Sequence, residues 1–241
     1  MLGDHAIFVA GMPRAGSMWT YNVTRHLIRL NGMKPLPEIL PPDDTRAADA
    51  ALRTAPPPGS VHCVKTHAML PVRRSDIRIL CNFRDIRDAA LSFMRFTRST
   101  FEEALESARQ AMKITDHYFS HTGTTVLPID YDDILETPEI VIQRIAGFIE
   151  VNVSGAQAAT IAAELSRDRI ARKVALLSDR TGRTARIRNR DGSYRLCDPG
   201  SGFQTNHITS SASGEWRHAF TEEQKRQLQE VLGDWLRRYG Y

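Results

Sequence analysis

Short apolar runs alternate along the chain with segments in which apolar residues recur at helical spacing. The runs at 6–10, 61–64, 77–83 and 124–129 have the length and composition of strands. Pro128 weakens the last of them, because proline cannot donate a hydrogen bond to a neighbouring strand. Strands that alternate with helices predict an α/β fold, with a parallel sheet of about four to five strands and helices on both faces.

Most of the predicted helices open with a residue that suits a helix N-terminus. They run from Ser17 to about Leu30, from the cap Asp85 to Phe96, over about 100–121, from the cap Thr137 onward and from 221 onward. Pro138 occupies the first helical position of the fourth helix, where proline is favoured. The stretch "TEEQ" at 221–224 is a capping box, and it makes the last helix the clearest of the chain.

Two segments show neither pattern. Residues 34–59 begin with the proline-rich stretch "KPLPEILPPDD", and 178–216 are rich in glycine, serine, arginine and asparagine. Long irregular segments in a compact domain are usually binding loops, lids or disordered chain. We therefore expect one domain over 1–241 in which residues 34–59, 94–115 and 178–210 line the pocket of a ligand.

Composition narrows the class of protein. The chain has 241 residues, 41% of them hydrophobic and 25% charged, which fits one globular domain with a sizeable core. No run approaches the roughly twenty apolar residues of a membrane span, and no leader sequence is recognisable. Cys63, Cys81 and Cys197 show no CxxC spacing, so we expect reduced thiols, no metal site and a cytoplasmic location. The sequence leaves a homodimer open.

Positive charge gathers in one stretch. Residues 167–195 hold nine arginines and one lysine against three aspartates, although the net charge of the chain is only +4. A solvated loop fits this pattern, and so does a flap over 180–195 that closes on an anionic ligand. Tyr194 is the one aromatic residue among these charges, which disfavours binding to nucleic acid.

The stretch "GMPRAGSMW", residues 11–19, follows the first predicted strand. Backbone N–H groups of Ala15, Gly16 and Ser17 can converge there on an anion, and the next helix adds its positive end. Arg14 can donate two hydrogen bonds to a phosphate. No Gly-Lys-Ser or Gly-Lys-Thr follows, so the loop is P-loop-like without being a nucleoside-triphosphate loop. An ordinary strand-to-helix turn is the alternative.

Two further pairs of residues lie at or beyond the ends of predicted strands. Lys65 and His67 alternate along the second strand, so they share one face, and the lysine keeps the histidine neutral and available as a base. Arg84 ends the third strand and Ser92 follows about two helical turns later, so both could face one phosphate. The alternatives are an inconsequential histidine and an Arg84 that pairs with Asp85 or Asp88.

Taken in order, these motifs resemble those of the sulfotransferases that use 3′-phosphoadenosine 5′-phosphosulfate (PAPS). "PRAGSMW" matches that family's phosphosulfate loop, "KTH" matches its Lys-Thr-His, and Arg84 with Ser92 matches its 3′-phosphate motif. "DYDDILETPE" at 130–139 and "SGEWRHAFT" at 213–221 match two later segments, so the resemblance spans nearly the whole chain. The family's Arg-Lys-Gly triplet is replaced by "TSS" at 209–211.

The resemblance implies a single sulfotransferase domain and a reaction. A sulfuryl group passes from PAPS to the hydroxyl of a small molecule, which gives a sulfate ester and adenosine 3′,5′-bisphosphate (PAP) without a metal. It implies His67 as base, with Lys65 and Arg14 stabilising the leaving group. The implied nucleotide-binding residues are Arg14, Ala15, Gly16, Ser17, Met18, Trp19, Arg84, Ser92, Tyr131, Ser210, Ser211 and Gly214. Trp19 would stack on adenine unless it packs in the core.

Two other functions stay open at this stage. A small-molecule kinase would need a magnesium-binding Ser or Thr directly after a loop lysine, and this loop has neither. A nucleotide-binding protein without catalytic activity is the other, and His67 argues against it. If 180–195 is a nucleotide lid, PAP should protect it from trypsin.

Overall fold

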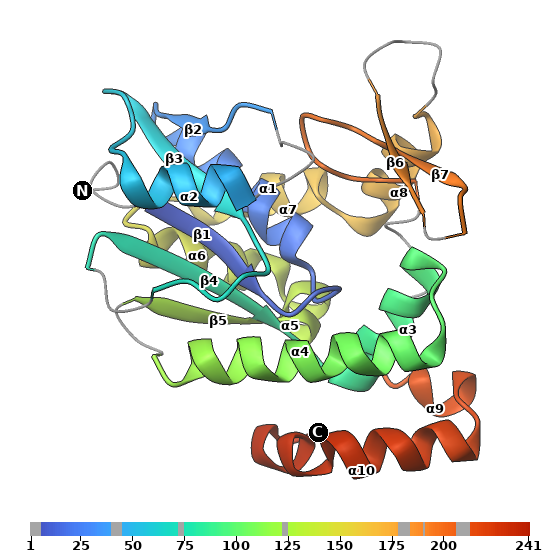
Figure 1. Ribbon diagram of the computed structural model, residues 1–241. Coiled ribbons are helices and arrows are strands. Elements are labelled where there is room, and N and C mark those ends of the chain that lie inside the picture. The colour runs from blue at the N-terminus through green and yellow to red at the C-terminus, as the bar shows by residue number, and fades with distance from the viewer. Residues whose placement is uncertain are drawn as a thin grey trace.

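Five strands form one parallel sheet in the computed structural model (Figure 1). They are β1 (Ala6–Gly11), β2 (Lys34–Leu36), β3 (Ser60–Lys65), β4 (Ile77–Phe83) and β5 (Val126–Asp130), in the order β2-β3-β1-β4-β5. The structure describes residues 6–39, 45–71, 75–121, 125–177, 184–189, 191–205 and 213–241. The predicted parallel α/β sheet is confirmed, and β2 is the one strand of this sheet that the pattern did not predict.

Helices surround this sheet, and a small hairpin lies outside it. The helices are α1 (Ser17–Leu30), α2 (Thr45–Arg53), α3 (Ile86–Thr97), α4 (Phe101–Phe119), α5 (Tyr131–Glu136), α6 (Pro138–Phe148), α7 (Gly155–Glu164), α8 (Arg167–Ala175), α9 (Trp216–Ala219) and α10 (Glu222–Tyr239). The hairpin pairs β6 (Ala185–Arg188) with β7 (Tyr194–Cys197) in antiparallel fashion. No helix in the described residues is long and apolar enough to cross a membrane.

Strand β1 shows why the sheet needs helices on both faces. Ile7 and Val9 pack with α1 and α6 on one face, while Phe8 and Ala10 pack with α2 and α4 on the other. All four side chains are fully buried. A central parallel strand buried on both sides is apolar at every position, which is why 6–10 reads as an unbroken apolar run.

The predicted helix starts are mostly confirmed. The Asp85 carboxylate accepts a hydrogen bond from the backbone N–H of Arg87 at 2.9 Å. Thr221 and Gln224 form the reciprocal capping box at the start of α10. Thr137 is the residue before α6, yet its side chain makes no capping bond, so Pro138 alone marks that start. The segments expected to be irregular contain β2, α2 and the hairpin.

A buried arginine on α1 fixes the chain that follows β2. Arg25 is 1% exposed, and its guanidinium donates to the hydroxyl of Tyr21 at 2.8 Å. It also donates to the carbonyl oxygens of Pro37 at 2.5 Å and Glu38 at 2.6 Å. Carbonyl oxygens thereby solvate a charge that would be costly to bury alone. The segment is held so that Ile39, its next residue, reaches the cavity described below.

Candidate active site

The loop after β1 is shaped by two glycines that have positive φ. Gly11 has φ +98°, and a Cβ there would lie 2.3 Å from the carbonyl oxygen of Asn82 on β4. Gly16 has φ +82°, and a Cβ would lie 2.9 Å from the side chain of Ile134. Both positions require glycine for conformation and for space. The loop therefore turns tightly into α1, whose first turn carries no acidic residue.

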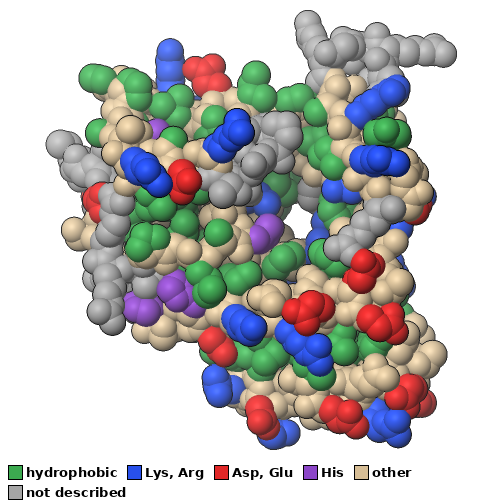
Figure 2. Space-filling view, viewed as in Figure 1, with side chains coloured by type: hydrophobic (Ala, Val, Ile, Leu, Met, Phe, Trp, Pro, Cys, Tyr) green, Lys and Arg blue, Asp and Glu red, His purple; other side chains and the backbone are tan. Residues whose placement is uncertain are grey.

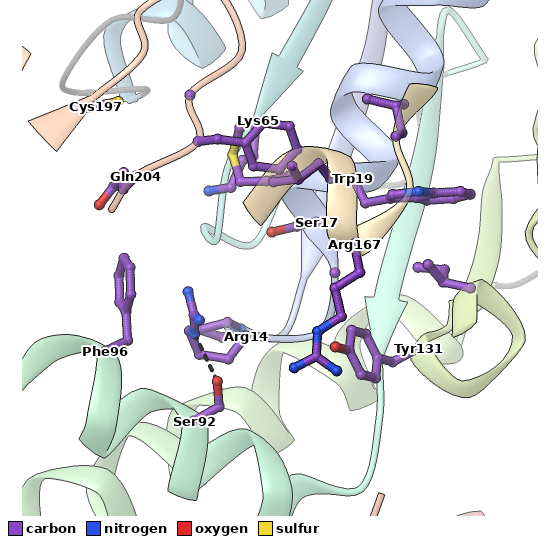
Figure 3. A pocket seen from close by; sticks show the side chains of 18 of the residues that line it. Arg14, Ser17, Trp19, Lys65, Ser92, Phe96, Tyr131, Arg167, Cys197 and Gln204 are labelled. Atoms are coloured by element: carbon purple, nitrogen blue, oxygen red, sulfur yellow. Dashed lines mark hydrogen bonds between the residues drawn. The ribbon is translucent and has the colours of Figure 1, made fainter. Parts of the chain in front are cut away.

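Arg14, in the middle of this loop, has an unusual backbone and a fixed side chain. Its φ of 66° is left-handed, which is uncommon for a residue with a Cβ and is typical of functional sites. Its Nε donates to the hydroxyl of Ser92 at 3.1 Å (Figure 3), and its guanidinium lies 3.9 Å from the ring centre of Phe96. Burial, and the nearby charges of Arg84 and Arg195, lower the pKa of Arg14 to about 10. The guanidinium therefore stays charged at neutral pH.

His67 lies just beyond β3, bonded at both ring nitrogens. Its Nδ1 is 2.9 Å from the carbonyl oxygen of Gly11, and its Nε2 is 3.0 Å from Nζ of Lys65. A carbonyl can only accept and an ammonium can only donate, so Nδ1 carries the hydrogen and Nε2 has the lone pair. Burial, and then the charge of Lys65, lower the pKa of His67 to about 3. At neutral pH the ring is a neutral base with Nε2 as its basic atom.

These groups meet in one cavity of about 800 Å³, a size typical of small-molecule sites. Figure 2 shows this face hollowed near its centre, with lysine or arginine side chains at the rim. Ten of the predicted residues line the cavity: Arg14, Gly16, Ser17, Met18, Trp19, Lys65, His67, Arg84, Ser92 and Tyr131. They come from the ends of β1, β3, β4 and β5 and from the helices that follow, where parallel sheets hold their ligands.

Arg84 is more constrained than the sequence indicates. It is 4% exposed, lies 4.2 Å from the ring centre of Tyr131, and its Nη2 is 3.7 Å from the carboxylate of Asp88. The same carboxylate accepts from the backbone N–H of Gly214 at 2.6 Å and of Trp216 at 3.1 Å. The alternative pairing with Asp88 is therefore present, although Arg84 also lines the cavity.

Several predicted nucleotide contacts lie elsewhere or have other partners. Ser92 is hydrogen-bonded to Arg14, whereas the spacing suggested that it shares a phosphate with Arg84. Gly214 gives its N–H to Asp88 and is not among the residues that line the cavity. Ala15 has a fully buried side chain, so any contact would use its backbone. Ser210 and Ser211 lie outside the described residues.

Trp19 packs in the core, as its alternative interpretation expected, and the stacking on adenine stays a prediction. It is 8% exposed and packs in the core cluster of α1 and α6, and it also lines the cavity. Part of the ring is therefore buried in the core while another part faces the cavity.

The remaining cavity wall comes mainly from segments without a motif. Residues within 34–59, 94–115 and 178–210 do contribute, as expected: Ile39, Phe96, Thr97, Ala185, Arg186, Ile187, Cys197, Pro199, Gly202, Phe203 and Gln204. The start of α8, including Ser166 and Arg167, was missed. The one feature of the sequence that could have indicated this contribution is that Arg167 is the first arginine of the basic stretch.

The basic stretch reaches the site through two of its arginines besides Arg167. Arg186 lines the cavity, and Arg195 lies 4.7 Å from the ring centre of Phe96, the ring that also contacts Arg14. Residues 178–183 and 190 lie outside the described part, and the flap over 180–195 stays a prediction. Among the described residues no group of three or more His, Cys, Asp or Glu could hold a metal ion.

Comparison with known families settles the class of the protein. The model of the sulfotransferase domain matches residues 4–240, nearly the entire chain. The chain belongs to the sulfotransferase family. The resemblance predicted from the loop, Lys-Thr-His and Arg84–Ser92 motifs is thus confirmed, and with it the activity of a sulfotransferase.

Solved structures show the same fold at low sequence identity. Retinol dehydratase in complex with retinol and PAP is 20% identical, with a TM-score of 0.68 over 97% of this chain and 81% of that chain. Mouse sulfotransferase SULT7A1 in complex with PAP is 17% identical, with a TM-score of 0.68 over 98% of this chain and 85% of that chain. A search of the curated proteins matches none to this sequence.

Proposed function

We propose that the cavity binds PAPS next to a small molecule with a hydroxyl group, and that His67 takes the proton of that hydroxyl during sulfuryl transfer. The observation that carries the proposal is the neutral imidazole, with Nδ1 bonded to Gly11 and Nε2 directed at Lys65. Arg14 lines the same cavity from the phosphate-type loop. Two structures of this fold were solved with PAP, which supports the choice of donor.

The proposed step forms one bond to sulfur and breaks another. The acceptor O–H passes its proton to Nε2 of His67 while the oxygen bonds to sulfur. The bond between sulfur and the bridging oxygen breaks, and its electron pair stays on the phosphate of PAP. Arg14 and Lys65 are cations placed to stabilise that growing negative charge. Lys65 would leave Nε2 for the phosphosulfate, a stronger anionic partner, and so free the base.

The loop and α1 suit the 5′-phosphosulfate of the donor. Backbone N–H groups at the start of α1 have no intrahelical partner, and no acidic residue in the first turn competes with an anion. Ser17, at that start, lines the cavity. Trp19 and Tyr131 line it too and offer aromatic surface to the adenine.

The part of the cavity formed by α3, the hairpin and the following loop suits the acceptor. Phe93, Phe96 and Phe203 contribute three aromatic rings, and Ile39 and Ile187 add aliphatic surface. We expect an acceptor whose hydroxyl is attached to an aromatic or apolar body, because such surface is desolvated favourably there.

The cytoplasmic location and the homodimer stay predictions.

Transfer of radiolabelled sulfate from PAPS to a panel of phenols, apolar alcohols and sugars tests the proposal. We expect labelled product from phenols or apolar alcohols, with one PAP formed per product. PAP should also raise the melting temperature, whereas ATP with magnesium should not. Failure to label any acceptor, together with stabilisation by ATP and magnesium alone, would overturn the proposal in favour of a kinase.

A further inference from the structure

The charge at the Arg84 end of the cavity is small for the ligand it should bind. The Arg84 guanidinium and the Asp88 carboxylate are both buried and 3.7 Å apart, so their charges largely offset each other. A phosphate monoester carries about −1.5 to −2 charges near neutral pH. In the described part of the chain, Nε of Arg84 is buried without a hydrogen-bond partner. One donor is therefore available there, and the site needs further positive charge.

Few cations line the cavity in the described residues. Arg14 is bonded to Ser92, and Lys65 is bonded to His67. Arg186 belongs to β6 of the hairpin. Arg167, the first residue of α8, lines the cavity as well. Figure 3 shows its side chain extending into the cavity, with the guanidinium beside Tyr131.

Tyr131 lies close to both Arg84 and Arg167. Its ring stacks on the guanidinium of Arg84 at 4.2 Å, and Arg167 approaches the same tyrosine from α8 (Figure 3). Helix α8 is anchored by Ile170 and Val174, which are each 5% exposed and belong to the main core cluster. The base of the Arg167 side chain is thus fixed on the scaffold while its end faces the cavity.

We propose that Arg167 binds the 3′-phosphate of the nucleotide together with Arg84. The inference rests on the proposed function, because it requires an adenosine 3′,5′-bisphosphate in the cavity. Arg167 supplies the charge that the sequence "TSS" at 209–211 does not carry. Its guanidinium donates paired hydrogen bonds to phosphate oxygens, a geometry that lysine cannot reproduce.

Isothermal titration of PAP and of 5′-AMP into three proteins tests this assignment. The proteins are the wild type, Arg167→Ala and the matched control Arg169→Ala, which removes an exposed arginine of the same helix that does not line the cavity. We expect Arg167→Ala to weaken PAP about 10- to 100-fold, as for a lost charge-assisted bond. Binding of 5′-AMP, which has no 3′-phosphate, should change less than about threefold, and Arg169→Ala should leave both unchanged.

The possible failures are distinguishable. Equal weakening of PAP and 5′-AMP by Arg167→Ala would mean a contact to the adenosine or the 5′-phosphate and would overturn the assignment. Unchanged PAP affinity in Arg167→Ala, with weakened affinity in Arg84→Ala, would overturn it while leaving the proposed function intact. If PAP does not bind the wild type, the proposed function fails and the assignment fails with it. Arg167 is exposed, so the melting temperature of the variant should match the wild type.

Discussion

The two walls of the cavity are built in different ways. The wall around the loop after β1 is built on the parallel sheet. Gly11 packs on the backbone of Asn82, and His67 is hydrogen-bonded to the carbonyl oxygen of Gly11. The opposite wall includes a two-stranded hairpin that lies outside the sheet. Its Tyr194 is 60% exposed, and its tip is tied to α3 by an exposed ion pair between Arg98 and Asp191 at 2.7 Å. Exposed ion pairs contribute little stability.

This difference in construction separates the residues proposed for the reaction from those proposed for acceptor specificity. The groups that we propose to carry the reaction are placed by the sheet, where a small displacement would disturb buried packing. The groups that we propose to contact the acceptor include residues of the hairpin and its neighbouring loop, which can vary without disturbing the sheet. Phe96 joins the two walls, because Arg14 of the loop and Arg195 of the hairpin both stack on its ring.

Among substitutions in the sheet-built wall, removal of the proposed base, His67, should have the largest effect on activity. We expect His67→Ala to lower kcat by about a hundred- to ten-thousand-fold, the usual cost of losing a general base. PAP affinity should stay nearly unchanged, because the base acts on the acceptor. Steady-state kinetics and titration with PAP measure both. His62→Ala, a half-exposed histidine on β3 outside the cavity, is the control, and a His67→Ala protein that keeps most of its turnover would remove His67 from this role.

Arg84→Ala should have the next largest effect, confined to ligands with a 3′-phosphate. Loss of a charge-assisted bond costs about 1.5 to 3 kcal/mol, so PAP should weaken about 10- to 100-fold while adenosine 5′-phosphosulfate changes little. Titration of both ligands, with melting temperatures, measures this. Equal weakening of the two ligands would show that Arg84 acts through stability, since the variant leaves Asp88 buried without its cation.

Phe96→Leu tests the connection between the walls. The substitution keeps apolar bulk but removes the π surface that two guanidiniums contact. A cation–π contact contributes about 0.5 to 2 kcal/mol, so kcat/KM for a good acceptor should fall about 2- to 30-fold. PAP affinity should change less than kcat/KM. An unchanged kcat/KM across the acceptor panel would show that the two walls work independently.

The activity should change least with pH, because the proposed base, His67, is already neutral. With the pKa of His67 lowered to about 3, kcat/KM should stay flat from about pH 8 down to about pH 5.5. An acid limb centred near the ordinary histidine pKa of about 6.5 would contradict the buried, Lys65-bonded geometry. Lys65→Ala removes a positive charge, so any acid limb in that variant should move to higher pH.

Local patterns predicted the sheet-built wall well. The apolar run 6–10 and the cap at Asp85 each act within a few residues, so their consequences are visible in the sequence. Pro128 was weighed against a strand, yet it pairs with Cys81 inside β5. Strand β5 lies at the sheet edge, where a missing N–H leaves no neighbour unpaired.

What could not be predicted depends on residues far apart in the chain. The left-handed backbone of Arg14 directs its side chain to Ser92, 78 positions away, and spacing alone favoured Arg84 as the partner. Asp88 binds the N–H groups of Gly214 and Trp216 across more than 120 positions, so the C-terminal segment looked free for a ligand. Arg167 opens a helix whose place beside Tyr131 follows from packing of α8 on the core.

The length of helix α1 fixes the separation between two parts of the pocket. Its first residue, Ser17, lines the cavity. Arg25, eight residues later, donates hydrogen bonds to the carbonyl oxygens of Pro37 and Glu38 and so fixes the position of Ile39. At 1.5 Å per residue, about 12 Å of helix separates the two ends. Inserting one residue between them would rotate Arg25 by about 100° about the helix axis, and its hydrogen bonds to the two carbonyl oxygens would be lost. A change in the length of this helix would therefore displace Ile39 abruptly, whereas substitution of Ile39 itself would change the cavity by the volume of one side chain.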